Sequence, residues 1–132
     1  MNLRGVRGAI TVKKNSKKEI LEATKRLLKM MVSVNKLKIE EVATAIFSVT
    51  KDLNAEFPAV AARKLGWLYS PLLCTYEIAV PGSLKKCIRI LLLVNTNKKQ
   101  KLIKHVYLGD ARKLRPDLKA KEKGLYYLSE PA

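Results

Sequence analysis

The chain has 132 residues, enough for one domain with a buried core, and its 48% hydrophobic content excludes wholesale disorder. Its 27 lysines and arginines against 11 aspartates and glutamates give a net charge of +16, a field that attracts anions such as nucleic acid, acidic lipid or a small polyanionic metabolite. No apolar run approaches the roughly 20 residues of a membrane-spanning helix, and no secretory signal is visible, so we expect a cytoplasmic protein whose two cysteines are reduced.

The N-terminal third predicts a strand followed by a helix. Residues 3–12 have strand character, and their two glycines mark a bulge or a close approach of the backbone. A helix is expected from Ser16 to about Asn35, because Ser16 and Glu19 have the spacing of a capping box. Apolar residues at helical spacing form one stripe along it, namely Ile20, Ala23, Thr24, Leu27, Met31 and Val34.

The middle of the chain predicts shorter elements. A turn at 38–41 precedes Val42–Thr50, which has strand character in its second half. After a loop at 52–55, Pro58 favours the first turn of a short helix that reaches about Leu65. Tyr69–Val80 is expected to be extended.

The last third begins after a turn at 81–83. Lys86–Val94 is the most strand-like segment, and its apolar residues on both faces predict burial on both faces. A short helix is expected at 97–104, a strand at His105–Gly109 and a short terminal piece at Leu114–Leu118. Strands interspersed with helices indicate an α/β or α+β fold with a mixed sheet.

Two charged residues interrupt apolar strands. Most basic residues occur in lysine runs typical of a solvated surface, but Arg89 lies inside the apolar run 87–92. A buried guanidinium needs an anion, and Glu77, itself inside a predicted strand, could be a core partner. Alternatively, both residues line a cavity and bind an anionic, hydroxylated ligand, since a guanidinium can grip a carboxylate with two bonds.

Other candidate residues carry weaker signals. Arg7 lies between Gly5 and Gly8, either as an edge-strand charge or as a ligand contact. Tyr107 lies on the predicted strand at 105–109, where packing in the core is the plainer interpretation. His105 alone indicates no specific role. The sequence has no phosphate-binding loop, HExxH, CxxC or GxSxG motif, so we expect neither a metal site nor a nucleophile.

An ordered set of short segments resembles one enzyme family. The segments are Leu3–Ala9, Phe57–Ala59, Cys74–Glu77, Leu84–Arg89, His105–Leu108 and Leu114–Leu118. Together they resemble the AroH-class monofunctional chorismate mutases over about residues 1–118, which would form one domain followed by a C-terminal tail at 119–132. The resemblance implies an α+β fold with a mixed five-stranded sheet packed by helices, and a homotrimeric pseudo-α/β-barrel with its sites at subunit interfaces.

The resemblance also implies a function and a set of site residues. It implies an isomerase of the shikimate pathway that converts chorismate to prephenate, for phenylalanine and tyrosine biosynthesis, without a cofactor. The residues implied as catalytic are Arg7, Cys74, Glu77, Arg89 and Tyr107. The further substrate contacts implied are Leu73, Thr75, Tyr76, Phe57, Ala59, Arg63, Leu114 and Arg115, of which Phe57, Ala59 and Arg63 would come from the neighbouring subunit.

The implied reaction assigns a task to each charge. Arg89 would meet the ether oxygen of chorismate as it becomes negative, while Arg7 and Tyr107 hold carboxylate oxygens and Glu77 and Cys74 bind the ring hydroxyl. Two other readings remain. The basic surface could bind nucleic acid, although its 6% aromatic content offers few stacking side chains, and the chain could be a trimer that binds an anionic metabolite without turnover.

Overall fold

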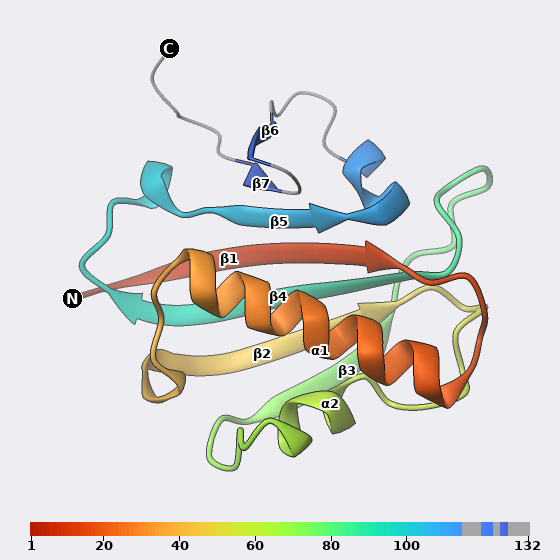
Figure 1. Ribbon diagram of the computed structural model, residues 1–132, viewed down its shortest axis with the longest axis horizontal. Coiled ribbons are helices and arrows are strands. Elements are labelled where there is room, and N and C mark those ends of the chain that lie inside the picture. The colour runs from red at the N-terminus through yellow and green to blue at the C-terminus, as the bar shows by residue number, and fades with distance from the viewer. Residues whose placement is uncertain (115–119, 123–124, 127–132) are drawn as a thin grey trace.

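The computed structural model describes residues 1–114, 120–122 and 125–126. One twisted sheet forms the centre, and the long helix α1 lies across one of its faces with the short helix α2 beside it (Figure 1). The helices are α1 (Lys17–Val34) and α2 (Ala59–Lys64), with 3-10 turns η1 (Ile39–Glu41), η2 (Gln100–Leu102) and η3 (Gly109–Leu114). The strands are β1 (Asn2–Thr11), β2 (Val42–Val49), β3 (Leu72–Tyr76), β4 (Cys87–Thr96), β5 (His105–Leu108), β6 (Ala120–Glu122) and β7 (Leu125–Tyr126).

The predicted mixed five-stranded sheet is confirmed. Its strand order is β3-β2-β4-β1-β5, and β7 and β6 continue the sheet beyond β5. The central strand β4 is antiparallel to both β1 and β2, whereas β3 and β5 run parallel to their neighbours. The two short C-terminal strands were not expected from the tail sequence.

The helix α1 forms where the capping signal places it. The hydroxyl of Ser16 accepts a hydrogen bond from the Glu19 backbone N–H at 3.2 Å, which satisfies one of the free N–H groups of the first turn. Most of the predicted apolar stripe is buried against the sheet, where it meets alternate residues of the strands; Ala23 and Val34 are only partly buried. The largest contributors from β2 and β4 are Phe47, Ile88, Ile90 and Leu92.

The approach of α1 to β1 depends on Gly8. A Cβ atom at Gly8 would lie 2.4 Å from Met31 Sδ and 3.0 Å from Leu27 Cδ1. All three residues are buried, so the helix can rest on the strand only where the strand carries no side chain. The glycine that marked a close backbone approach in the sequence is the point of contact.

Several helix and strand boundaries in the structure differ from those predicted from the sequence. Strand β2 spans all of Val42–Val49, and β3 is confined to Leu72–Tyr76 because Pro71 just before it has no N–H to donate. The helix expected at 97–104 is wrong: β4 continues to Thr96, whose hydroxyl accepts the Lys98 N–H, and only the turn η2 follows.

The expectation that β4 is buried on both faces is also wrong for the single chain. Ile88, Ile90 and Leu92 lie under α1, whereas Arg89 and Leu91 on the opposite face are only half-buried. We call this opposite side of the sheet the open face; it carries Arg7, Ile46, Ser48, Arg89 and Leu91. The turn η3 covers only the part of it near Tyr107.

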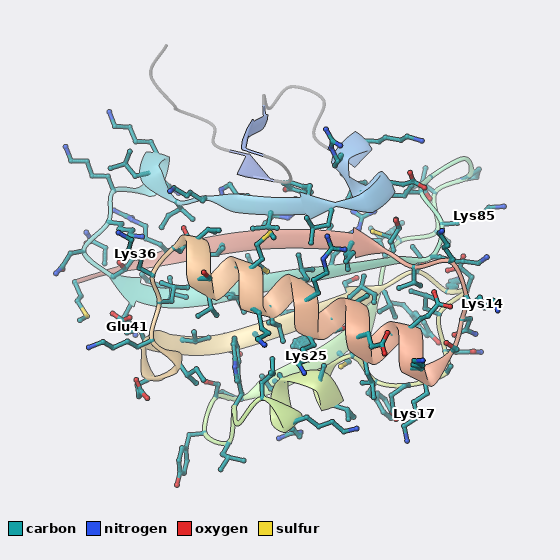
Figure 2. All side chains as sticks on the ribbon, viewed as in Figure 1. Lys14, Lys17, Lys25, Lys36, Glu41 and Lys85 are labelled. Carbon is teal, nitrogen blue, oxygen red and sulfur yellow. The ribbon has the colours of Figure 1, made fainter. Side chains whose placement is uncertain are left out.

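Most of the positive charge lies on exposed lysines. Figure 2 shows lysines around the helix and the loops at both ends of the sheet, and those labelled there are Lys14, Lys17, Lys25, Lys36 and Lys85. None of the described helices is long and apolar enough to cross a membrane.

Candidate active site

Strand register brings the predicted site residues of the open face into one row. Arg89 pairs with Ala9 of β1 on one side and with Ser48 of β2 on the other. Ala9 in turn pairs with Tyr107, and Ser48 pairs with Thr75. Since paired residues in neighbouring strands point to the same face, all five side chains project from the open face, with Arg89 on the central strand.

Arg89 and Glu77 form an ion pair at the middle of this row. Arg89 Nε lies 3.3 Å from Glu77 Oε2, and the Ser48 hydroxyl donates to the same oxygen at 3.4 Å. The two side chains are 21% and 29% exposed, so the pair sits at the surface of the open face rather than inside the core. The Nε atom itself is buried and makes no hydrogen bond among the described residues, so its contact with Glu77 is an ion pair alone.

Arg7 adds a second cation to the open face. It pairs with Leu91, two residues along β4 from Arg89, and diagonal neighbours of this kind lie about 7–8 Å apart. Tyr107 is buried in a cluster with Ala9 and the thiol of Cys87. Two arginines and one carboxylate therefore share the open face, which leaves this part of the sheet with an excess of positive charge.

The remaining predicted residues form a second group at the β3 edge. Cys74 pairs with the buried Phe47, so its side chain is on the helix side of the sheet. Burial raises the pKa of its thiol there, and Ala59 and Arg63 of α2 partly oppose the rise. Phe57, 69% exposed, borders a pocket of about 340 Å³ at this edge. The pocket is lined by Val49, Leu53, Asn54, Ala55, Glu56, Phe57, Pro58, Cys74, Thr75 and Tyr76.

Within one chain, these two groups are not brought together. The Cys74 side chain lies on the helix side of the sheet, whereas Glu77 pairs with Arg89 on the open face. Leu73 and Tyr76 are exposed on β3, and Leu114 packs against the cluster around Tyr107. Arg115 lies outside the described residues.

Three residues that were not predicted as site residues contact predicted ones. Ser48 binds Glu77, the Cys87 thiol lies beside the Arg89 guanidinium, and His105 accepts a hydrogen bond from the backbone of Arg7. The position of Cys87 two residues before Arg89 could have revealed it, because alternate residues share a face. The His105 contact joins distant parts of the chain and has no local signal.

The chemistry available on the open face is that of an anion receptor. Two guanidinium groups, a carboxylate and a phenol can bind a doubly charged ligand and one hydroxyl group. Among the described residues, no three His, Cys, Asp or Glu side chains gather where they could hold a metal ion.

The two cysteines should react slowly with alkylating reagents at neutral pH. Burial raises the pKa of both thiols; Arg63 partly opposes it at Cys74, and Arg89 and Arg7 partly oppose it at Cys87, where Glu77 adds to the rise. Because only the thiolate reacts, iodoacetamide labelling should be slower than for a free cysteine and should accelerate as the pH rises above the usual thiol pKa. Peptide mass spectrometry should find half-buried Cys74 modified before Cys87. Equal rates in the native protein would contradict this burial.

Comparisons with known proteins identify the family of the chain. The family model described as chorismate mutase type I matches residues 3–118. The chain is 48% identical over 119 residues to chorismate mutase AroH of Bacillus subtilis and to that of Thermus thermophilus, covering 89% of this chain and 94% and 98% of those proteins. A solved chorismate mutase from Clostridium thermocellum shares 51% identity with a TM-score of 0.82, over 83% of this chain and 97% of that one. The chain belongs to the type I chorismate mutase family.

Proposed function

We propose that this protein converts chorismate to prephenate by a Claisen rearrangement, in the biosynthesis of phenylalanine and tyrosine. The observation that carries the proposal is the partly exposed Arg89–Glu77 pair on the open face, with Arg7 and Tyr107 on the same face. Chorismate is a dianion with a ring hydroxyl and an enolpyruvyl ether, and this set of groups matches those features. The rearrangement breaks the ether C–O bond as a new C–C bond forms in the same molecule, so it needs neither a nucleophile nor a proton transfer.

Arg89 is the principal catalytic group in this proposal. Negative charge develops on the ether oxygen as the C–O bond breaks, and a donor fixed in advance at that oxygen stabilises the transition state more than the substrate. The ion pair with Glu77 engages the Nε edge, and the two amino groups of the guanidinium carry the donors that would face the ether oxygen and a carboxylate.

The other residues of the open face would select the reactive conformer. Arg7 and Tyr107 would bind carboxylate oxygens, and Glu77 would bind the ring hydroxyl while its charge favours a positively polarised ring. Holding both ends of chorismate in the chair-like geometry converts part of the activation entropy into binding. The net positive charge of the protein would raise the rate of encounter with the dianion.

The site would be completed by a second copy of the chain in a homotrimer. Arg89 and Glu77 lie on the open face, whereas Phe57, Ala59 and Arg63 lie at the β3 edge beside the pocket and α2, so one copy would supply each group. Large apolar side chains are exposed along this edge and the segment after it, as expected for a surface that a neighbour covers. They are Phe57, Leu73, Tyr76, Ile78 and Val80.

The proposed activity is tested with chorismate and purified protein. Loss of the ultraviolet absorbance of chorismate, together with formation of prephenate, should proceed without an added metal or cofactor. Binding of chorismate without turnover would instead identify a non-catalytic metabolite-binding trimer. Binding to nucleic acid with an affinity that falls steeply as the salt concentration rises, again without turnover, would favour the alternative of a nucleic-acid-binding protein.

The shared site is tested by mixing two inactive variants. Arg89→Ala removes one group of the site and Arg63→Ala the other, so each homotrimer should be poorly active. In mixed trimers, each site draws its two halves from neighbouring copies, and random mixing leaves about one quarter of the sites intact. Co-refolding equal amounts should therefore restore about a quarter of the wild-type turnover. No recovery despite mixed trimers on a native gel would show that both arginines come from one chain.

A further inference from the structure

We infer that His105 is a positioning residue for Arg7, acting through a hydrogen bond to the Arg7 backbone. This inference rests on the role proposed above for the Arg7 side chain. His105 is the only histidine of the chain, and its ring nitrogen Nδ1 accepts the Arg7 backbone N–H at 3.0 Å. The two residues are 98 positions apart in the sequence and meet where β1 lies beside β5.

The bond lies at the point where the regular ladder between β1 and β5 stops. Pairing of these parallel strands begins at Gly8 and Val106, one residue after Arg7 and His105. Continuing the ladder by one step would direct the Arg7 N–H toward the carbonyl of Lys104. The imidazole of His105 provides the acceptor there instead, so a side-chain hydrogen bond replaces the next backbone hydrogen bond of the ladder.

A buried amide holds the start of β5 in place. Asn35, fully buried at the end of α1, donates from Nδ2 to the carbonyls of Met31 and Lys104 at 2.9 and 2.8 Å. Its Oδ1 accepts the Lys104 N–H at 2.8 Å. The residue just before His105 is thus fixed to the helix by two bonds, which sets the position from which the imidazole reaches Arg7.

Pairing with β4 orders the backbone of Arg7 on one side, and the bond to His105 restrains it on the β5 side. Gly5 and Gly8 stand on either side of Arg7, and glycine gives a strand more conformational freedom than any other residue. Without this bond, the Arg7 guanidinium would occupy a wider range of positions. A displacement of about 1 Å at a catalytic group can lower the rate by up to about 100-fold. Fixing the Arg7 N–H would therefore affect the rate through the position of the guanidinium as well as through the energy of one hydrogen bond.

The hydrogen bond requires a particular tautomer of His105. An acceptor Nδ1 carries no proton, so the neutral ring must be protonated at Nε2. A long-range ¹H–¹⁵N correlation spectrum of the wild-type protein above the histidine pKa should show the Nε2–H form. The opposite tautomer, with hydrogen on Nδ1, would overturn the inference. This measurement uses no substrate, so its outcome is separate from whether chorismate is turned over.

Three substitutions of His105 distinguish the effect of the position of the hydrogen-bond acceptor from the effect of side-chain polarity. Asparagine places its Oδ1 where Nδ1 lies, whereas glutamine is equally polar but reaches farther, and leucine has no acceptor. We expect His105→Leu and His105→Gln to lose about five- to tenfold in kcat/KM, as for one neutral hydrogen bond, and His105→Asn to stay within about threefold of wild type. Equal activity of all three variants would overturn the inference.

A double-mutant cycle with Arg7 distinguishes positioning from a general structural effect. If His105 acts through the Arg7 side chain, His105→Leu should cause no further loss in an Arg7→Ala background. An undiminished further loss would mean that the imidazole supports something else and would overturn the inference. Full turnover by Arg7→Ala would remove Arg7 from the site and the positioning role with it, while wild-type turnover of chorismate would still support the proposed function.

Discussion

Replacing Arg89 with alanine should lower kcat by about 100- to 1,000-fold or more, the usual effect of removing one fixed donor from a developing negative charge. Glutamine at this position should do nearly as badly, because it retains hydrogen-bonding capacity but not the charge. Lysine should also be poor, since a single ammonium cannot reproduce a planar group that forms an ion pair with Glu77 at one edge and offers two further amino groups to a ligand. Steady-state kinetics with chorismate gives the measurement.

A matched variant separates this effect from the overall charge. Arg26 is exposed on α1, on the other side of the sheet from the open face, so Arg26→Gln removes the same charge from the molecule without touching the site. Its kcat should stay close to that of the wild type. Near-normal turnover by Arg89→Ala in a correctly folded protein would remove Arg89 from the mechanism.

Shortening Met31 to alanine should lower the free energy of unfolding by about 2–5 kcal/mol, because Met31 is fully buried between α1 and β1. Lys29→Ala, on the exposed side of the same helix, should change it by less than about 0.5 kcal/mol. Urea denaturation followed by circular dichroism at one fixed protein concentration measures both, since unfolding of an oligomer depends on concentration.

The partner of Met31 gives a sharper version of this experiment. Gly8→Ala alone should destabilise the protein by about 1–3 kcal/mol, because the new methyl group collides with Met31 Sδ. In the double variant the methyl group enters space that Met31→Ala has vacated, so the combined loss should be smaller than the sum of the single losses. Strict additivity would mean that the two residues do not share this space.

Local signals predicted the framework of the fold. The helix begins after Ser16 because capping chemistry and apolar spacing act within one segment, and each of the five main strands lies within or across a segment of strand-like composition. Boundaries were less predictable, since Thr96 stays in β4 through pairing with Asn2, which lies far away in the sequence. The short strands β6 and β7 also depend on pairing beside β5, which their own sequences do not reveal.

Parts of the site could be predicted, and others could not. Arg89 and Glu77 attracted notice because each is a charge inside an apolar segment, and the structure pairs them. The separation of Cys74 from Glu77 was available in principle, because an odd spacing along an extended chain puts two side chains on opposite faces. That the open face of β4 is only half-buried in one chain could not be predicted, since continuous apolar residues fit either a covered or an uncovered face.

Strand β4 ties catalysis to folding through its pleat. Ile88 and Ile90 lie in the hydrophobic core, and Arg89 between them lies on the open face, where we propose that chorismate binds. Inserting or deleting one residue just before this stretch would exchange the two environments, sending a guanidinium into the interior and an isoleucine out to meet an anion. Insertions and deletions among relatives should therefore be rare within this strand, even at positions that touch no ligand. They should be common in the connections at its two ends.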